Sequence, residues 1–351
     1  MAAPPFPAPP RPVPGSRAVV HIGLHKTATT LIQATLAANR AALAAHGVDY
    51  PRAGPGPAHH ALLALWHEMP PGSRPDGDPR ALWAGLAALA APGRTLLLSS
   101  EVFARAAPPR ADLGQMRALL AAYAEIRLVC VLRAPIAHIQ SLVLEVARQA
   151  PLDLARAIRM ALAEGRAEGV AVDRMRLHAR LRADFAAHEI VYLDHAGFQR
   201  TATGPAAAVL AAAGAPAAAG EGLAPPPARA AHPSWPPLPT WLVHEVLGPG
   251  ALHDPARAAP ARAAAQALLD ARFGAGRAST LFTRAEWRTL AAHFAPIEAA
   301  FAAARAAEGR PAPAAGPPAP PDPDSPAGRA CVWRDDLDQG FLAAAAAALP
   351  G

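Results

Sequence analysis

Short apolar runs alternate with longer segments of helical spacing along the first two hundred residues. The runs at 17–23, 95–100, 126–132 and 189–193 predict four strands. The third run is apolar at nearly every position, which is typical of a parallel strand buried on both faces. Apolar residues at helical spacing predict helices at 29–46, 59–69, 80–91, 112–124, 135–149 and 174–187. Strands separated by helices indicate an α/β fold with a parallel β-sheet flanked by helices.

Local signals mark the ends of three of these helices. Gly47 ends the helix at 29–46, and Asp112 is the expected N-cap of the helix at 112–124. Pro135 opens the next helix at its first position, where a missing N–H costs nothing.

The pattern weakens after residue 200, where Ala, Pro and Gly dominate. Helices are predicted at 238–247, 254–273 and 283–307. The sequence predicts one α/β domain with a helical C-terminal part, flanked by disordered tails rich in Pro and Ala. The predicted parts are a disordered leader at 1–16, the domain at 17–309, a Pro-rich linker at 310–328 and a tail at 329–351 with a loose helix.

Composition excludes several classes of protein. No apolar run approaches the ~20 residues of a membrane span, and the Pro-rich start lacks the apolar stretch of a signal peptide, so we expect a cytoplasmic protein. The chain has two cysteines, Cys130 and Cys331, too few for a disulfide scaffold or a Cys-based zinc site. No cluster of His, Asp and Glu has the spacing of metal ligands, so no metal is expected.

The formal net charge is +6. The basic residues are unusual in kind, because the 33 comprise 32 Arg and a single Lys. The arginines are scattered among Asp and Glu instead of forming one stripe, which argues against a nucleic-acid partner. The single Lys26 stands out, since a guanidinium does not replace a compact ammonium where space is limited.

Lys26 lies where a strand gives way to a helix. In a parallel sheet, ligands bind beyond the carboxyl ends of the strands, and a helix N-terminus there favours phosphate or sulfate. Thr27, Thr29 and Thr30 add hydroxyl donors around Lys26. The nucleotide motif G-x-x-x-x-G-K-[ST] needs a glycine directly before the lysine, and His25 occupies that position. This departure counts against an NTPase.

The segment Gly23-Leu-His-Lys-Thr-Ala-Thr-Thr resembles the start of bacterial sulfotransferases that use 3′-phosphoadenosine 5′-phosphosulfate (PAPS). The resemblance covers roughly residues 18–200 and implies a P-loop-like three-layer sandwich. It implies that the 5′-phosphosulfate is bound by Lys26, Thr27, Ala28, Thr29 and Thr30. Ala28 departs from the family, which usually has Gly there. If this position has a positive φ, Ala costs about 1 kcal/mol or more and its methyl crowds the phosphate.

The resemblance also implies a site for the 3′-phosphate of PAPS. In the family an Arg at the end of a central strand is followed eight residues later by a Ser in the next helix. Arg133 and Ser141 have this spacing. A guanidinium at the carboxyl edge of the sheet can bind a phosphate bidentately, and the hydroxyl adds a further donor.

Four residues are candidates for the groups that act on the acceptor. Sulfuryl transfer to an alcohol needs a group that takes the hydroxyl proton. Glu101, after the strand at 95–100, matches the position of a carboxylate base in several family members. His25 lies inside the loop and is a candidate contact of the sulfuryl group. His59 and His60 correspond to histidines that face the acceptor in relatives, and a neutral imidazole also suits a base near pH 7.

The function that we expect is transfer of the sulfuryl group from PAPS to a hydroxyl of a carbohydrate or another small alcohol. One alternative is a P-loop kinase or NTPase, in which Asp194 after the strand at 189–193 would hold Mg²⁺. Another is a non-catalytic nucleotide-binding relative, suggested by Ala28. The sequence leaves the acceptor and the oligomeric state open.

Overall fold

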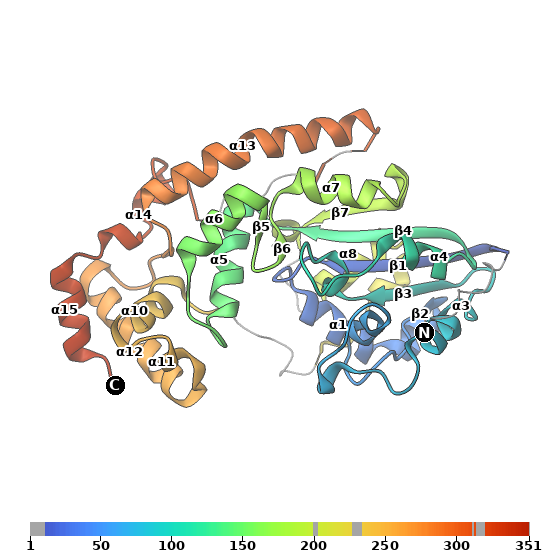
Figure 1. Ribbon diagram of the computed structural model, residues 1–351, viewed down its shortest axis with the longest axis horizontal. Helices are drawn as coiled ribbons and strands as arrows, with labels where there is room; N and C mark the ends of the chain where they lie inside the picture. The colour runs from blue at the N-terminus through green and yellow to red at the C-terminus, as the bar shows by residue number, and fades with distance from the viewer. Residues whose placement is uncertain (1–10, 199–202, 227–233, 311, 314–319, 351) are drawn as a thin grey trace, which may run out of the picture. The chain divides into compact units, whose positions relative to one another are not determined.

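The computed structural model describes residues 11–198, 203–226, 234–310, 312–313 and 320–350 (Figure 1). The chain forms two compact units, each made of three separate segments. The first comprises Met1–Leu132, His178–His232 and Ala306–Pro313, and the second comprises Arg133–Leu177, Pro233–Arg305 and Ala314–Gly351. The sequence predicts no such division, because its apolar pattern continues through both units.

The first unit contains a parallel five-stranded sheet, which confirms the predicted α/β fold. Its strands are β1 (Val13–Gly23), β2 (Val48–Asp49), β3 (Thr95–Ser99), β4 (Tyr123–Leu132) and β7 (Ile190–Asp194). They lie in the order β2-β3-β1-β4-β7, and every neighbouring pair is parallel (Figure 1). All carboxyl ends therefore meet at one edge of the sheet.

The strand β1 begins four residues before its predicted start, at Val13 instead of residue 17. Residues 13–16, assigned from the sequence to the disordered leader, are therefore part of the sheet. The Ser16 hydroxyl donates to the Val13 carbonyl (2.6 Å) and accepts from the Ala124 N–H (3.2 Å). Residues 1–10 of the predicted leader lie outside the described residues. The strand β2 has only two residues, too few for a periodicity to reveal.

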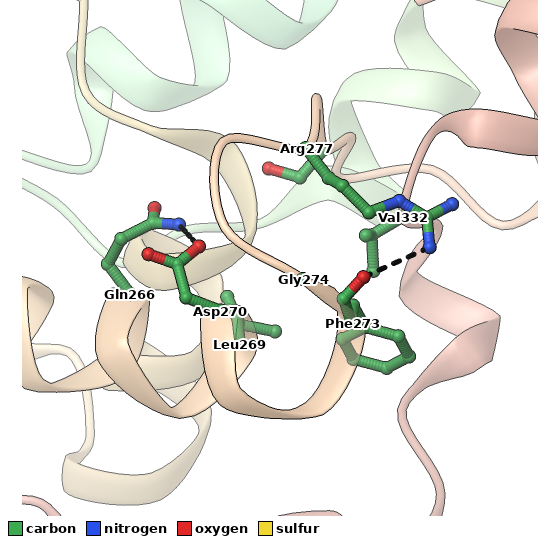
Figure 2. Close-up of a pocket in the computed structure, with 8 residues that line it drawn as sticks. Gln266, Leu269, Asp270, Phe273, Gly274, Arg277 and Val332 are labelled. Carbon is green, nitrogen blue, oxygen red and sulfur yellow. Dashed lines mark hydrogen bonds between the residues drawn. The ribbon is translucent and has the colours of Figure 1, made fainter.

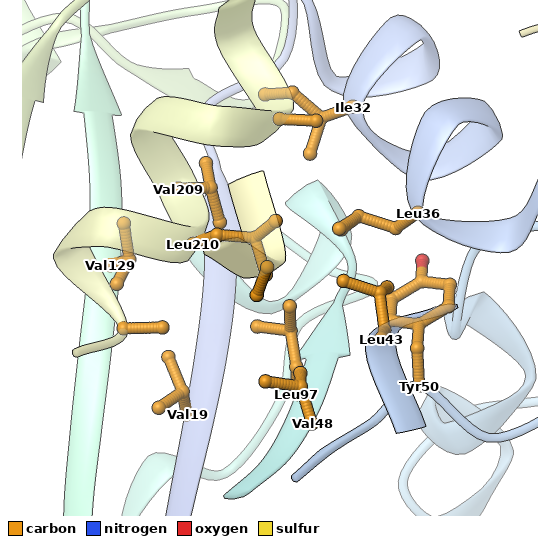
Figure 3. Close-up of a cluster of buried hydrophobic side chains, with 13 residues drawn as sticks. Val19, Ile32, Leu36, Leu43, Val48, Tyr50, Leu97, Val129, Val209 and Leu210 are labelled. Carbon is orange, nitrogen blue, oxygen red and sulfur yellow. The ribbon is translucent and has the colours of Figure 1, made fainter. Parts of the chain in front are cut away.

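Alternate residues of the central strands face opposite sides of the sheet. Val19, Leu97 and Val129 pack in one cluster with side chains of three helices, α1 (Thr29–Ala38), α2 (Arg40–Ala45) and α8 (Gly204–Ala212) (Figure 3). Their neighbours along the strands, such as Val20 and Leu98, face the other side of the sheet and are fully buried as well. The sheet is therefore covered on both faces, as expected for parallel strands.

The predicted helix at 29–46 is broken at Asn39 into α1 and α2. The Asn39 amide donates to the Thr35 carbonyl (2.7 Å) and to the Ala224 carbonyl (3.0 Å), and its oxygen accepts from the Ala224 N–H (2.9 Å). A side chain that bonds to the backbone in this way competes with a continuous helix.

Two other helices of this unit, predicted to start at residues 80 and 112, start within one residue of those positions. Asp112 is the N-cap of α4 (Leu113–Leu119), because its carboxylate accepts from the Gln115 N–H (2.8 Å), as predicted. The helix expected at 59–69 is a 3-10 helix at His60–Leu65. The others are α3 (Pro79–Ala87), α9 (Ala217–Gly220) and a 3-10 helix at Glu101–Ala104, while α7 (Arg174–Arg182) spans the division between the units.

The second unit is mainly helical. Pro135 is the first residue of α5 (Pro135–Val146), as predicted. The amphipathic α6 (Leu154–Glu164) and the hairpin of β5 (Arg166–Ala167) and β6 (Val170–Ala171) were not predicted. Further helices are α10 (Pro237–Leu247), α11 (Gly250–His253), α12 (Pro255–Phe273), α13 (Arg284–Ala307), α14 (Pro326–Ala330) and α15 (Gln339–Ala348). The helix α14 begins inside the predicted linker, of which residues 311 and 314–319 lie outside the described residues.

Candidate functional site

The loop between β1 and α1 contains strained backbone at the residue that the sequence singled out. Lys26 (φ 62°) and Ala28 (φ 65°) are both left-handed, and Glu168 is the third non-glycine residue with positive φ in the described part of the chain. Each such residue costs about 1–2 kcal/mol. Strain of this kind concentrates at functional sites, where the surroundings hold it in place. Ala28 thus has the positive φ at which, as stated above, an alanine costs about 1 kcal/mol or more relative to glycine.

Hydrogen bonds close this loop from the inside. The Leu24 N–H donates to the Val131 carbonyl of the neighbouring strand (3.1 Å), and the Thr27 hydroxyl donates to the Leu24 carbonyl (2.5 Å). Thr27 is fully buried, and its hydroxyl bonds within the loop. Thr29 is buried too, whereas Thr30 is exposed at the start of α1.

The start of α1 has no side chain that caps its N–H groups. Its N-cap residue is Ala28, and the first turn contains no acidic residue. An N-cap side chain would accept from one of the first N–H groups. The N–H groups of this ten-residue helix are therefore left with their partial positive charge beside Lys26, an arrangement that suits an anion.

Glu101 packs directly against Gly23, the last residue of β1 before this loop. A Cβ atom on Gly23 would lie 2.5 Å from the Cβ of Glu101 and 3.3 Å from the Cγ2 of Thr29. Gly23 also has a φ of 79°. The glycine therefore permits the contact, and the structure brings Glu101 and the Lys26 loop together at the same edge of the sheet.

The Glu101 carboxylate has different partners on its two oxygens. Oε2 accepts from Nε2 of Gln33 (2.7 Å), and Oε1 lies 3.7 Å from Nε2 of His60. Burial raises the pKa of Glu101, but His60, His25 and the hydrogen bonds outweigh it and hold the pKa below its usual value. The carboxylate is therefore charged at neutral pH.

Sequence reasoning missed Gln33. The signal that could have found it is a polar residue on the apolar face of a predicted helix, next to Ile32 and one turn before Leu36 and Ala37. Gln33 is 3 % exposed, so its amide is buried as deeply as the apolar side chains around it.

The neighbouring histidines His59 and His60 have different environments. His59 is 1 % exposed; its Nδ1 accepts from the Ser99 N–H and its Nε2 donates to the Pro51 carbonyl, both at 2.9 Å. Burial lowers the pKa of His59 to about 4. Both ring nitrogens bond to the backbone, so His59 connects β3 to the loop at Pro51. Its contact with the acceptor stays a prediction.

His60 is the accessible member of the pair. Its side chain is 32 % exposed, Nδ1 lies 2.7 Å from the Ser100 hydroxyl oxygen, and Nε2 is directed toward Glu101. Of the two predicted acceptor-site histidines, His60 is therefore the one that the structure places beside the predicted base.

A further histidine, His21, lies beneath this group and was not singled out from the sequence. Its Nδ1 is 2.8 Å from the Ser99 hydroxyl oxygen, and the side chain is fully buried in β1. Burial lowers the pKa of His21 to about 4, although the charge of Glu101 opposes the change. Three histidines thus contact consecutive residues at the end of β3. His21 and His59 bond to Ser99, and His60 contacts Ser100 and Glu101.

Arg133 and Ser141 belong to the second unit. Arg133 follows β4 directly, and burial lowers the pKa of its guanidinium. Ser141 lies in α5, and its buried hydroxyl oxygen has no hydrogen-bond partner among the described residues. That these two residues share a ligand with Lys26 stays a prediction, because it concerns both units.

The second unit contains a pocket that none of these residues lines (Figure 2). Its polar groups already bond to one another: Gln266 donates to the Asp270 carboxylate (2.8 Å), and Arg277 donates to the Phe273 carbonyl (3.3 Å).

The residues that the structure describes contain no group of three or more His, Cys, Asp or Glu placed to hold a metal ion. Nor does any helix among them have the length and apolar character needed to cross a membrane.

Comparison with known proteins gives one slight likeness. No family model and no curated protein matches the chain. The crystal structure of a sulfotransferase from Alicyclobacillus acidocaldarius is similar, with a TM-score of 0.38 and 15 % sequence identity, over 70 % of this chain and 94 % of that chain. A likeness of this size does not establish a family, so the function rests on the residues of the site.

Proposed function

We propose that the protein is a PAPS-dependent sulfotransferase. The observation that carries the proposal is the strained Lys26 loop, which opens into an uncapped helix N-terminus and has the charged Glu101 packed against it. The loop provides donors and positive charge for an anion, and Glu101 provides a group that can take a proton. The motif that resembles bacterial sulfotransferases falls on these same residues.

Each unit contains residues whose chemistry suits one anionic end of PAPS. The Lys26 loop and the first turn of α1 would hold the 5′-phosphosulfate, and Arg133 with the buried Ser141 hydroxyl would hold the 3′-phosphate. The methyl group of Ala28, held at a positive φ, is the one feature of the loop that works against tight binding.

When bound, PAPS supplies the sulfuryl group. The acceptor oxygen forms a bond to sulfur while the bond from sulfur to the bridging phosphate oxygen breaks, and the hydroxyl proton leaves for the protein. The Lys26 ammonium neutralises the charge that develops on the departing phosphate. The expected acceptor is a carbohydrate or another small alcohol.

Glu101 and His60 together are suited to take the proton. The depressed pKa of Glu101 makes this carboxylate a weak base by itself. Its Oε1 lies 3.7 Å from Nε2 of His60, so a hydroxyl bound beside both could pass its proton to the imidazole while the carboxylate stabilises the resulting imidazolium. His25, in the loop, lies close enough to Glu101 for its charge to act on the carboxylate.

Ligand binding and transfer test this proposal in the wild type and in Lys26→Ala. Without Mg²⁺, adenosine 3′,5′-bisphosphate should raise the melting temperature of the wild type. Loss of the ammonium should lower the rate of transfer from PAPS about 100-fold or more, since a charge that stabilises the transition state is removed. The exposed Arg52→Ala serves as the control for a lost positive charge.

Three results would count against the assignment. Unchanged turnover in Lys26→Ala would exclude the proposed role of the loop. Stabilisation by ATP with Mg²⁺, but not by the bisphosphate, would favour a kinase or NTPase. Binding of the bisphosphate without transfer to any acceptor would favour a non-catalytic relative.

A further inference from the structure

The Gln33 side chain links the proposed anion-binding helix to the proposed base. Gln33 lies on α1 four residues after Thr29, about one helical turn beyond the N-terminus. Its amide is 3 % exposed and donates to Oε2 of Glu101 at 2.7 Å. Burying an amide among apolar side chains is costly unless it is hydrogen-bonded, so this bond is what makes the residue acceptable there.

The geometry distinguishes the two oxygens of Glu101. Gln33 occupies Oε2, which leaves Oε1 on the side of His60. On the opposite side, Gly23 allows the backbone of β1 to approach the Cβ of Glu101 closely. The carboxylate is therefore fixed at its base by packing and at one oxygen by a hydrogen bond.

We propose that Gln33 is a positioning residue that fixes which oxygen of Glu101 faces His60 and the acceptor hydroxyl. This inference rests on the proposed sulfotransferase function, in which Glu101 and His60 receive the proton. Because Gln33 and the anion-binding N–H groups belong to one helix, a donor bound at the start of α1 and the carboxylate are held in a fixed relation. In this proposal Gln33 is buried behind the carboxylate and acts through it.

The charged and titratable groups that act on Glu101 come from several elements. They are His60 from the 3-10 helix, His25 from the loop, His21 from β1 and Tyr50, which follows β2. His60 and His25 hold the pKa of Glu101 down together with the Gln33 hydrogen bond, against the effect of burial. Removing the Gln33 amide should raise this pKa and leave the imidazoles in place.

The test uses Gln33→Met, which keeps the shape and removes the donor, and Gln33→Glu, which sets a second carboxylate beside Glu101. The control is Thr35→Val, a buried residue of the same helix whose hydroxyl donates only to the Leu31 carbonyl. Titration of the Glu101 carboxyl by ¹³C NMR, assigned by its loss in Glu101→Gln, reads the effect without any turnover. The pH dependence of kcat and the KM for PAPS give the second readout.

In Gln33→Met we expect the Glu101 titration to move up by about one pH unit. We also expect kcat to fall about tenfold, as for loss of a hydrogen bond to a charged group, with little change in the KM for PAPS. Gln33→Glu should give a larger upward movement, because two adjacent carboxylates compete for ionisation. Thr35→Val should leave both readouts unchanged.

An unchanged Glu101 titration in folded Gln33→Met or Gln33→Glu would overturn the inference. A kcat loss of the same size in Thr35→Val would overturn it too, because the effect would then be general to α1. If Glu101 titrates as expected in the variants but the wild type transfers no sulfuryl group, the proposed function fails, and with it any part for Gln33 in the reaction. The two failures are therefore distinguishable.

Discussion

Two turns at the carboxyl edge of the sheet follow buried parallel strands and lead into helices, yet they are built differently. The β1–α1 loop contains two left-handed residues, Lys26 and Ala28, and its helix begins without a capping side chain. The β4–α5 turn consists of Arg133 and Ala134, with Ala134 at φ −53° and ψ 129°, and Pro135 sets the first helical residue. The first turn is strained, and the second is relaxed.

The difference shows what each turn is built for. Two left-handed residues cost about 2–4 kcal/mol together, which must be offset by the bonds of Thr27 and Leu24 and by packing around Gly23. The β4–α5 turn bears no such cost, because a proline at the first position of a helix is already in the required conformation. Of these two turns, the strained one is the turn in which backbone N–H groups and a lysine are gathered, which supports a binding role for it.

The largest effect that we expect concerns the buried histidines behind the strained turn. His21 and His59 are held neutral in the fold, with pKa values lowered from 6.5 to about 4 by burial. The unfolded chain binds these protons at higher pH, so stability is fully present above pH 6.5 and is lost as the pH falls toward 4. The loss is about 3 kcal/mol for each histidine. Urea unfolding at pH 7 and at pH 4.5 measures it.

A matched variant separates this effect from general acid unfolding. His59→Phe lowers stability at pH 7 because it leaves the Ser99 N–H and the Pro51 carbonyl unpaired, but it should reduce the further loss between pH 7 and pH 4.5. An equal pH dependence in the variant and the wild type would show that His59 is not kept neutral by the fold.

The second prediction compares the ligands of the two turns. Arg133→Ala should weaken the binding of adenosine 3′,5′-bisphosphate about 10- to 100-fold, since one charged contact is lost. It should barely affect adenosine 5′-phosphosulfate, which has no 3′-phosphate, whereas Lys26→Ala should weaken both. Isothermal titration calorimetry gives the four affinities. Equal losses for both ligands in Arg133→Ala would contradict the assignment of Arg133 to the 3′-phosphate.

The smallest effect that we expect comes from adding glycine to each turn. Ala28→Gly removes the penalty of a positive φ and should raise stability by up to about 1 kcal/mol, or about 2 °C in melting temperature. Ala134→Gly should lower stability slightly, because a residue at φ −53° gains nothing from glycine and the unfolded chain becomes freer. Melting curves of both variants make the comparison, and a gain in both would remove the contrast between the turns.

The sequence predicted the sheet well because its strands are marked by strong local signals. The apolar runs at β3, β4 and β7 and the caps at Asp112 and Pro135 report on burial and backbone geometry within a few residues. It did not predict the division into two units, the break at Asn39 or the two-residue β2. These depend on contacts between distant segments, such as that of Asn39 with Ala224, which leave no local period.

The roles given to the candidate site residues stay predictions, and the structure adds how these residues lie relative to one another. The alternation of strands and helices implied that Lys26 and Glu101 lie at the carboxyl edge of the sheet, but not that the strands before them lie side by side. The different environments of His59 and His60 could not be predicted from the sequence. The two residues are adjacent and of the same type, and they differ in the direction of their side chains: His59 bonds to the Pro51 carbonyl and His60 to the Ser100 hydroxyl. Gln33 was missed since a polar residue among apolar ones gives no sign of its partner.

The missing side chain of Gly23 has a consequence for how this protein can change over generations. A Cβ atom there would lie 2.5 Å from the Cβ and 2.9 Å from the Cα of Glu101, so position 23 cannot change unless the backbone at residue 101 moves. The constraint runs in one direction, because residue 101 can carry another side chain while the glycine stays. Descendants that keep this packing should therefore keep the glycine, even where they have replaced the carboxylate.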